Sequence, residues 1–427
     1  MLIKDVSKNV GKEVTFCGWL NNKRSSGKVH FLEIRDGTGY IQSVYADADT
    51  KILDTIGLVA HESSVSMKGI VNEHPRKPGT YELQLTGIEI ISQAIDFPIS
   101  KKEHGPEFLL ANRHLWLRSK KQWAIMRIRN KVIYSSMDFF HKENFIKIDA
   151  PIITPVACEG TTTLFDIDYF DLGKGYLSQS GQLYIEAAIF AHNRVYDFGP
   201  VFRAEKSNTR KHLIEFWMLD AEMAYCDHEQ NMSMQEKFMK HVIKDVLESC
   251  KEELEILQRD TTILEKIIHS SFERMTHADV VKFLRSKGSA ITDQDDLGAQ
   301  DETILGNEFN KPIFIEKWPK QIKAFYMKRD PNNPNVVLGD DLIVPEGYGE
   351  IFGGSQREDN YDVLLDIMKE EKLSLDDFGW YLDLRKYGSV PHSGFGMGLE
   401  RMVSWLSGTQ HIRETIPFPR LLNRIRP

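Results

Sequence analysis

The chain has 427 residues, of which 41% are apolar and 27% charged, a composition typical of a soluble globular protein with two or three domains. Its formal net charge of -8 argues against indiscriminate binding of polyanions, so any contact with RNA should be a local basic patch. The 4 cysteines form no C-x-x-C pair, the N-terminus has no apolar signal-like segment, and no apolar run could span a membrane. We therefore expect a cytoplasmic protein with reduced thiols.

Residues 1–96 contain short runs of strand type separated by turn formers. The runs cover residues 14–20, 29–35, 40–45, 65–71 and 81–91. Short strands at this spacing predict a small β-barrel, and an OB-fold fits because its exposed face commonly holds single-stranded nucleic acid. A purely structural all-β domain is the alternative.

Residues 97–118 are predicted to be a linker, because periodicity is lost and charge increases from Phe97 onward. A second domain, 119–427, begins with apolar residues at helical spacing over 119–140. We expect further helices over 230–257 and in the acidic stretch 260–310, which has no recognisable motif. Strands mixed with helices, without regular βαβ alternation, predict an α+β domain on a mostly antiparallel sheet.

The segment 195–225, VYDFGPVFRAEKSNTRKHLIEFWMLDAEMAY, is the most informative stretch and has the pattern of strand, polar loop and strand. Because side chains alternate in a strand, one face of the second run carries an aromatic ring and two carboxylates. These side chains are Phe216, Met218, Asp220 and Glu222. Buried carboxylates need partners, so this face should line a polar cleft that Arg203 and Glu205 can also reach. Such a set suits a nucleotide; a surface hairpin with ion pairs is the alternative.

Two later segments add candidate phosphate and metal ligands. The segment SVPHSGFGMGLERMVSWLSG, 389–408, predicts a glycine-rich strand-to-helix turn with Arg401 in the first helical turn, although packing glycines are common. In GDDLIVPEGYGEIFGGSQRE, 339–358, Asp341 and Glu350 could bind a hard cation such as magnesium. Solvated acids at a turn are the alternative.

Together these segments resemble the three signature motifs of the class II aminoacyl-tRNA synthetases. The helix that leads into residues 148–151 is similar to motif 1, FRAE followed by HLIEF to motif 2, and GFGMGLERM to motif 3. A barrel followed by a catalytic domain is similar to the aspartate, asparagine and lysine branch. The resemblance covers nearly the whole chain.

The resemblance implies that ATP is a substrate and magnesium a cofactor. By similarity, Arg203 holds the α-phosphate and the carboxylate of the amino acid, Glu205 accepts from the adenine amine, and Phe216 stacks beneath adenine. His212 and Arg401 would meet the β- and γ-phosphates. The catalytic pair is thus Arg203 with Arg401.

The implied magnesium ligands are Asp341 and Glu350. Related aspartate enzymes carry a Ser three residues after the matching Glu, whereas this chain has Gly353. The complete ligand set is therefore left open.

A local difference from the aspartate enzymes indicates the amino acid. They read S-P-Q-L-x-K-Q where this chain has SGQLYIEA, so the Lys that pairs with a substrate carboxylate is replaced by Ile185. A neutral amide side chain fits better, with Arg357 donating to its oxygen and Asp220 accepting from its nitrogen. The resemblance thus implies L-asparagine and tRNA(Asn) as substrates. The candidates for its ammonium group are Glu159, Ser180 and Gln182.

In the barrel, exposed cations flank an aromatic ring. Arg24, Phe31 and Gln42 are the predicted anticodon contacts, with Lys23 and Lys28 nearby. Motif 1 builds a dimer interface in relatives, so we expect a homodimer. Two alternatives stay open, namely an aspartyl enzyme that charges both tRNAs and a paralogue that makes free asparagine by amidotransfer.

Overall fold

The computed structural model describes residues 1–158, 164–207 and 209–427. It divides into two compact units, Met1–Leu110 and Ala111–Pro427. The division falls inside the segment 97–118, which carries two short helices, α2 (Pro106–Ala111) and α3 (Arg113–Trp116). No helix in the described ranges is long and apolar enough to cross a membrane.

The first unit is a closed five-stranded barrel with the strand order β1-β2-β3-β5-β4. The strands are β1 (Glu13–Ser26), β2 (Val29–Arg35), β3 (Tyr40–Tyr45), β4 (Ser64–Glu73) and β5 (Tyr81–Ser92). Asp49 precedes helix α1 (Thr50–Leu58), and its carboxylate accepts from the backbone amides of Lys51 and Ile52 in the first turn. The predicted barrel is confirmed, because inward-facing apolar residues of every strand fill one core.

The second unit is built on a sheet of nine described strands, in the order β12-β13-β15-β16-β17-β11-β10-β6, with β14 paired to β15. Only the pairs β12–β13 and β10–β6 are parallel among these strands, so the predicted mostly antiparallel sheet is confirmed. The strands are β6 (Ile146–Lys147), β10 (Arg194–Phe202), β11 (Glu215–Ala224), β12 (Glu273–Thr276), β13 (Ile313–Pro319), β14 (Arg329–Asp330), β15 (Asn333–Val344), β16 (Gly349–Gln356) and β17 (His392–Gly398).

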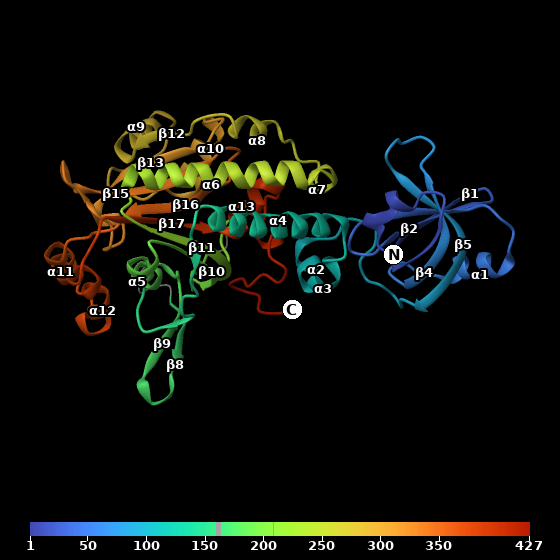
Figure 1. Ribbon diagram of the computed structural model, residues 1–427, viewed down its shortest axis with the longest axis horizontal. Helices are drawn as coiled ribbons and strands as arrows, with labels where there is room; N and C mark the ends of the chain where they lie inside the picture. Colours follow the sequence, from blue (N-terminus) through green and yellow to red (C-terminus); the bar gives the residue numbers. More distant parts are fainter. Residues whose placement is uncertain (159–163, 208) are drawn as a thin grey trace. The chain divides into compact units, whose positions relative to one another are not determined.

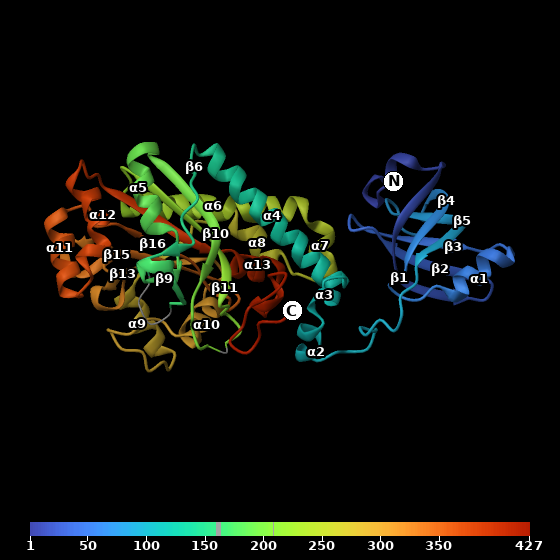
Figure 2. The same ribbon diagram turned by 90° about the horizontal axis from the view of Figure 1, so that it is seen from below.

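Helices α4 (Lys120–Lys142) and α6 (His228–Ser249) lie side by side and cover one face of this sheet (Figures 1 and 2). Their apolar stripes pack with that face of the sheet into the largest core of the protein. The opposite face is left for the site. The remaining helices are α5 (Gln182–His192), α7 (Lys251–Ile256), α8 (Thr262–Ile267), α9 (His277–Ser286), α10 (Ala299–Glu308), α11 (Tyr361–Glu370), α12 (Leu375–Lys386) and α13 (Leu399–Ser407).

Short elements complete the unit. A hairpin of β8 (Asp166–Asp168) and β9 (Lys174–Leu177) pairs with β7 (Ile153–Thr154) and projects from the body of the unit (Figure 1). The stretch 260–310 is less helical than predicted, because β12 adds a parallel edge strand to β13. The four-residue length of β12 gives too little periodicity for prediction. The 3₁₀ helices are η1 (Ile3–Asn9), η3 (Phe170–Leu172), η4 (Lys320–Ile322) and η5 (Ile412–Glu414).

Candidate active site

A cavity of about 900 Å³ opens over the uncovered face of the large sheet. The predicted site residues that line it are Ser180, Gln182, Arg203, Glu205, His212, Phe216, Asp220, Asp341, Glu350, Arg357 and Arg401. The outermost two, Ser180 and Arg401, are more than two hundred residues apart in the sequence, and the fold brings the whole set into one cavity. Glu159 lies outside the described residues.

The floor of the cavity is the central part of β11 against β17. The alternation predicted for β11 is confirmed, since Leu219, Ala221 and Met223 enter the large core on one face. On the other face Asp220 lies opposite Gly396 and Glu222 opposite Gly394 in the antiparallel register. The glycines leave room for these carboxylates, because a Cβ would come within 2.8 Å of Asp220 Oδ1 at 396 and 2.1 Å of Glu222 Oε1 at 394.

Two guanidinium groups reach into the same cavity from different motifs. Arg203 follows β10, and its guanidinium carbon lies 5.4 Å from the centre of the Phe216 ring. Arg401 stands in the first turn of α13 and donates to the Glu350 carbonyl at 2.9 Å and to its carboxylate at 3.2 Å. The Arg203 Nε is buried and has no partner among the described residues. Donors of this kind suit the oxygens of a polyphosphate.

His212 lies between these groups in the loop that joins β10 to β11. Its Nε2 is 3.6 Å from Glu205 Oε2, and its Nδ1 contacts the hydroxyl of Thr209. Burial and the nearby Arg401 guanidinium lower the pKa of His212 below its ordinary value. The ring is therefore mostly neutral near pH 7 in the ligand-free protein, even with Glu205 beside it.

The predicted metal ligands converge above Gly353. A Cβ at this position would lie 3.2 Å from Glu350 Oε1 and 3.7 Å from Asp341 Oδ1, so both carboxylates face the same small space. Lys323 neutralises part of the charge, since its Nζ is 2.7 Å from Asp341 Oδ2. The described residues contain no cluster of three or more acidic, His or Cys side chains that could hold a metal. Two carboxylates nonetheless fit magnesium, which normally completes its shell with substrate phosphates and water.

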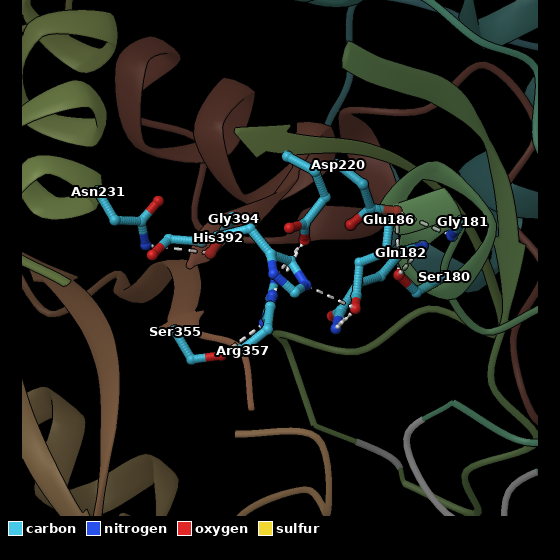
Figure 3. A network of polar contacts seen from close by, with 12 residues as sticks. Ser180, Gly181, Gln182, Glu186, Asp220, Asn231, Ser355, Arg357, His392 and Gly394 are labelled. Atoms are coloured by element: carbon cyan, nitrogen blue, oxygen red, sulfur yellow. Dashed lines mark hydrogen bonds and ion pairs between the residues drawn. The ribbon is translucent and has the colours of Figure 1, made fainter. Parts of the chain in front are cut away.

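At the far end of the floor, Asp220 is held by the start of α5. Its Oδ2 accepts from the Ser180 hydroxyl at 3.0 Å and from the Gly181 backbone amide at 2.9 Å (Figure 3). Ser180 Oγ accepts in turn from the backbone amide of Gln182 at 3.1 Å. These contacts gather a carboxylate, a hydroxyl and a side-chain amide, all of which can accept from an ammonium group.

Arg357 forms the other wall at this end, and its partner is Glu222. Its Nε and Nη2 donate to Glu222 Oε1 at 3.1 and 2.5 Å, and its Nη1 donates to the Ser355 hydroxyl at 2.5 Å. Burial raises the pKa of Glu222, but the Arg357 guanidinium donates twice to Glu222 Oε1 and opposes this rise, so the pair is an ion pair. Glu222 Oε2 is buried and has no partner in the part of the chain that the structure describes. The geometry therefore favours Glu222 over Asp220 as the carboxylate beside Arg357.

Ile185, on the first turns of α5, has no exposed surface. It packs with Ile189, Val195 and Ala224 in a small apolar cluster. An apolar environment of this kind disfavours an uncompensated charge. The position where the aspartate enzymes carry a cation is thus apolar in this protein.

The barrel carries the predicted anticodon residues on one face. The Arg24 guanidinium carbon lies 4.6 Å from the centre of the Phe31 ring, and Arg24 Nη2 donates to Gln42 Oε1 at 3.3 Å. Lys23 differs from expectation, because its ammonium donates to the carbonyls of Ile56, Gly57 and Val59 at 2.8 to 2.9 Å. Lys23 therefore closes the C-terminal end of α1, and Arg24 is the cation beside the aromatic ring.

Comparison with known families and structures agrees with this arrangement. Residues 105–422 match the family described as tRNA synthetases class II (D, K and N), and residues 14–91 match the OB-fold nucleic acid binding domain. The chain belongs to this class II synthetase family.

Among its relatives is an asparagine–tRNA ligase from Pelotomaculum thermopropionicum, 53% identical over 429 residues, covering 100% of this chain and 99% of the relative. A crystal structure of asparaginyl-tRNA synthetase from Pyrococcus horikoshii, complexed with asparaginyl-adenylate, has a TM-score of 0.95 and 42% identity. A second complex of that kind, from Entamoeba histolytica, has a TM-score of 0.90 and 31% identity. Each of these two matches covers 100% of this chain and 99% of the chain in the solved structure.

Proposed function

We propose that this protein activates L-asparagine with ATP and transfers the asparaginyl group to the 3' end of tRNA(Asn). The observation that carries the substrate choice is the ion pair between Arg357, which lines the cavity, and the buried Glu222 behind it. Arg357 can donate to the amide oxygen of asparagine, and the unpartnered Glu222 Oε2 can accept from the amide nitrogen. The full-length relatives named as asparagine–tRNA ligases support this choice.

Aspartate fits this end of the cavity less well. Its second side-chain oxygen would face Glu222 without a hydrogen to donate, and like charges at this distance repel. Arg357 is already paired with Glu222, and Ile185, which packs in an apolar cluster, adds no second cation. Discrimination between asparagine and aspartate thus rests on hydrogen-bond complementarity. Such complementarity can give a large ratio of kcat/KM between two substrates when the wrong one leaves a buried polar group unpaired.

The first chemical step joins the asparagine carboxylate to the α-phosphorus of ATP in line, with pyrophosphate as the leaving group. Arg203 is the residue for the α-phosphate, Glu205 and Phe216 suit the adenine, and Arg401 with His212 suits the outer phosphates. Magnesium, when held by Asp341 and Glu350, neutralises charge on the phosphate oxygens. No side-chain nucleophile is required, because the carboxylate of the substrate attacks directly.

In the second step a ribose hydroxyl of the terminal tRNA adenosine attacks the carbonyl carbon of the adenylate and AMP leaves. Asp220, Ser180 and Gln182 hold the ammonium group of the amino acid throughout, and Glu159 is a further candidate. The barrel recognises the anticodon through Phe31, Arg24 and Gln42, since a ring beside a guanidinium is a stacking site for a base.

Two further parts of the proposal concern assembly and compartment. The second unit leaves Tyr134, Ile146, Ile152 and Ile153 exposed on α4 and the segment that follows it, in the region similar to motif 1. These apolar side chains support a homodimer, which sedimentation velocity can test. Four free cysteines fit a reducing cytoplasm.

Exchange of labelled pyrophosphate into ATP tests the central proposal, with asparagine and then aspartate as the sole amino acid. We expect exchange with asparagine and little with aspartate, followed by charging of tRNA(Asn). Exchange with aspartate alone would reverse the substrate assignment. Release of free asparagine from aspartate, ATP and added ammonium would favour the amidotransfer alternative.

A further inference from the structure

Behind the amino-acid end of the cavity, the carboxylate of Glu186 on α5 has no exposed surface. Four polar side chains converge on it. They are Gln182 Nε2 at 3.0 Å, Tyr381 OH at 2.6 Å, Arg385 Nη2 at 2.8 Å and His392 Nε2 at 3.2 Å. Burial of a carboxylate is costly unless it is paired with a cation and fully hydrogen-bonded. Glu186 has a cationic partner in Arg385 and neutral donors in Gln182 and Tyr381.

Glu186 is charged in this environment. Burial alone would raise its pKa, but the Arg385 guanidinium, the His392 ring and Arg357 outweigh burial and hold the pKa of Glu186 below its usual range. Neither Glu186 nor Arg385 has exposed side-chain surface. Glu186 therefore neutralises the positive charge of Arg385, which solvent cannot screen because both side chains are buried.

The contact with Gln182 fixes the orientation of a cavity-lining amide. An amide has an NH2 donor side and a carbonyl acceptor side, and the Glu186 carboxylate can only accept. The NH2 of Gln182 must therefore face Glu186, which leaves the Gln182 oxygen to accept elsewhere. Because Gln182 lines the cavity, that oxygen is the group available to an ammonium ion.

The same network reaches the Arg357 side of the cavity. Arg385 Nε donates to the Glu358 carbonyl at 2.8 Å, and the Arg357 backbone amide donates to the His392 carbonyl at 2.9 Å. Figure 3 shows the contacts that run from Gln182 through Glu186 and His392 towards Arg357. Gln182 on one side of the amino-acid site and Arg357 on the other are thus held by the same buried hydrogen-bond network.

We propose that Glu186 is a positioning and specificity residue for the amino acid. It turns the Gln182 oxygen towards the substrate ammonium group, and its charge cancels that of Arg385, so that the pocket does not attract a second substrate carboxylate. This inference rests on the proposed activation of asparagine. It assigns α12, which supplies Tyr381 and Arg385, to amino-acid selection.

The test is Glu186→Gln, which keeps the size of the side chain but removes the charge. Pyrophosphate exchange is measured with asparagine and with aspartate, and KM for ATP is measured at saturating asparagine. We expect KM for asparagine to rise about tenfold, the asparagine-to-aspartate ratio of kcat/KM to fall at least fivefold, and KM for ATP to stay within twofold. Glu248→Gln, the same change at an exposed carboxylate that pairs with Lys244, should leave both KM for asparagine and the ratio unchanged.

The outcomes separate this inference from the proposal beneath it. Absence of exchange with asparagine in the unaltered protein would remove the proposed function itself. Normal exchange there, with a Glu186→Gln variant that loses both activities equally, would refute only the selective role. If that variant does not fold, Glu186→Asp decides, because it keeps the charge but shortens the reach: a raised KM for asparagine with an unchanged ratio supports the inference, and wild-type kinetics overturns it.

Discussion

Asp220 and Gly396 lie opposite each other on β11 and β17, with space between them for a hydrogen atom but not for a side chain. In Gly396→Ala the new Cβ would lie 2.8 Å from Asp220 Oδ1 and displace the carboxylate. We expect KM for asparagine to rise at least tenfold in pyrophosphate exchange, because the ammonium group loses an aligned acceptor.

The matched control is Gly398→Ala on the same strand. A Cβ there comes no closer than 4.0 Å, to Arg401 Cγ, and Gly398 has an ordinary backbone conformation. Its kinetics should stay within about twofold of the unaltered protein, since replacing Gly by Ala at a helix N-cap costs only about 0.5 kcal/mol of stability. Equal losses in both variants would mean that any added methyl group in this turn is harmful, and the particular role of Gly396 would be wrong.

Glu222→Gln tests the pair that closes the amino-acid end. It leaves the buried Arg357 without a counter-charge, and breaking a buried pair in this way costs about 3–5 kcal/mol. We expect a lower melting temperature and a fall in kcat/KM for asparagine of about a hundredfold. Glu248→Gln removes an exposed ion pair with Lys244 and should change neither quantity measurably. A folded Glu222→Gln variant with normal KM for asparagine would contradict the assigned role.

Sequence patterns predicted the barrel and the floor of the site because both depend on short-range regularities. Alternation along β11 assigned Phe216, Asp220 and Glu222 to one face, and the structure confirms it. The register with β17 also explains why Gly394 and Gly396 are two residues apart, since each lies opposite a carboxylate of β11. From the sequence alone these glycines could have served either close packing or the approach of a ligand.

The partner of Arg357 could not be predicted in the same way. Two carboxylates share one face of β11, and Arg357, which follows β16, lies 135 residues beyond Glu222 in the sequence. The choice between Asp220 and Glu222 depends on the start of α5, which holds Asp220 through Ser180 and Gly181. Glu186 belongs to the segment SGQLYIEA, but the sequence did not indicate that it is buried and paired. Its partner Arg385 is 199 residues away and belongs to no recognised motif.

Arg203→Ala should abolish adenylate formation. The guanidinium group is the donor that stabilises charge on the α-phosphate as it develops, and loss of one such donor costs about a hundredfold to a thousandfold in rate. Pyrophosphate exchange and single-turnover adenylate formation would measure the loss. Arg274→Ala, which breaks a surface contact with Glu229, serves as the control and should keep normal exchange. Normal exchange in Arg203→Ala would refute its role.

Phe31→Ala distinguishes tRNA binding from amino-acid activation, because Phe31 belongs to the barrel and the adenylate site belongs to the other unit. Loss of one stacked base costs about 1–3 kcal/mol, so KM for tRNA(Asn) should rise roughly fivefold to a hundredfold. Pyrophosphate exchange without tRNA should stay normal. His30→Ala, the neighbouring position on β2 whose side chain points to the other side of the strand, should leave charging nearly unchanged. If exchange and charging fall together, the barrel is not a separate anticodon site.

His212 gives the site a measurable proton linkage. Burial and Arg401 hold its pKa below the ordinary value, so the ring of the ATP-free protein is more often neutral than protonated at pH 6.5 to 7. A triphosphate beside the ring favours the protonated form and raises that pKa again, so ATP binding should take up protons and its affinity should increase as pH falls through this range. Calorimetry at pH 6.5 in two buffers of different ionisation enthalpy measures this uptake. His212→Gln removes the titrating group while ATP still contributes its own protons, so the difference between the two proteins isolates His212. Equal proton uptake by both would mean that His212 does not contact the outer phosphates.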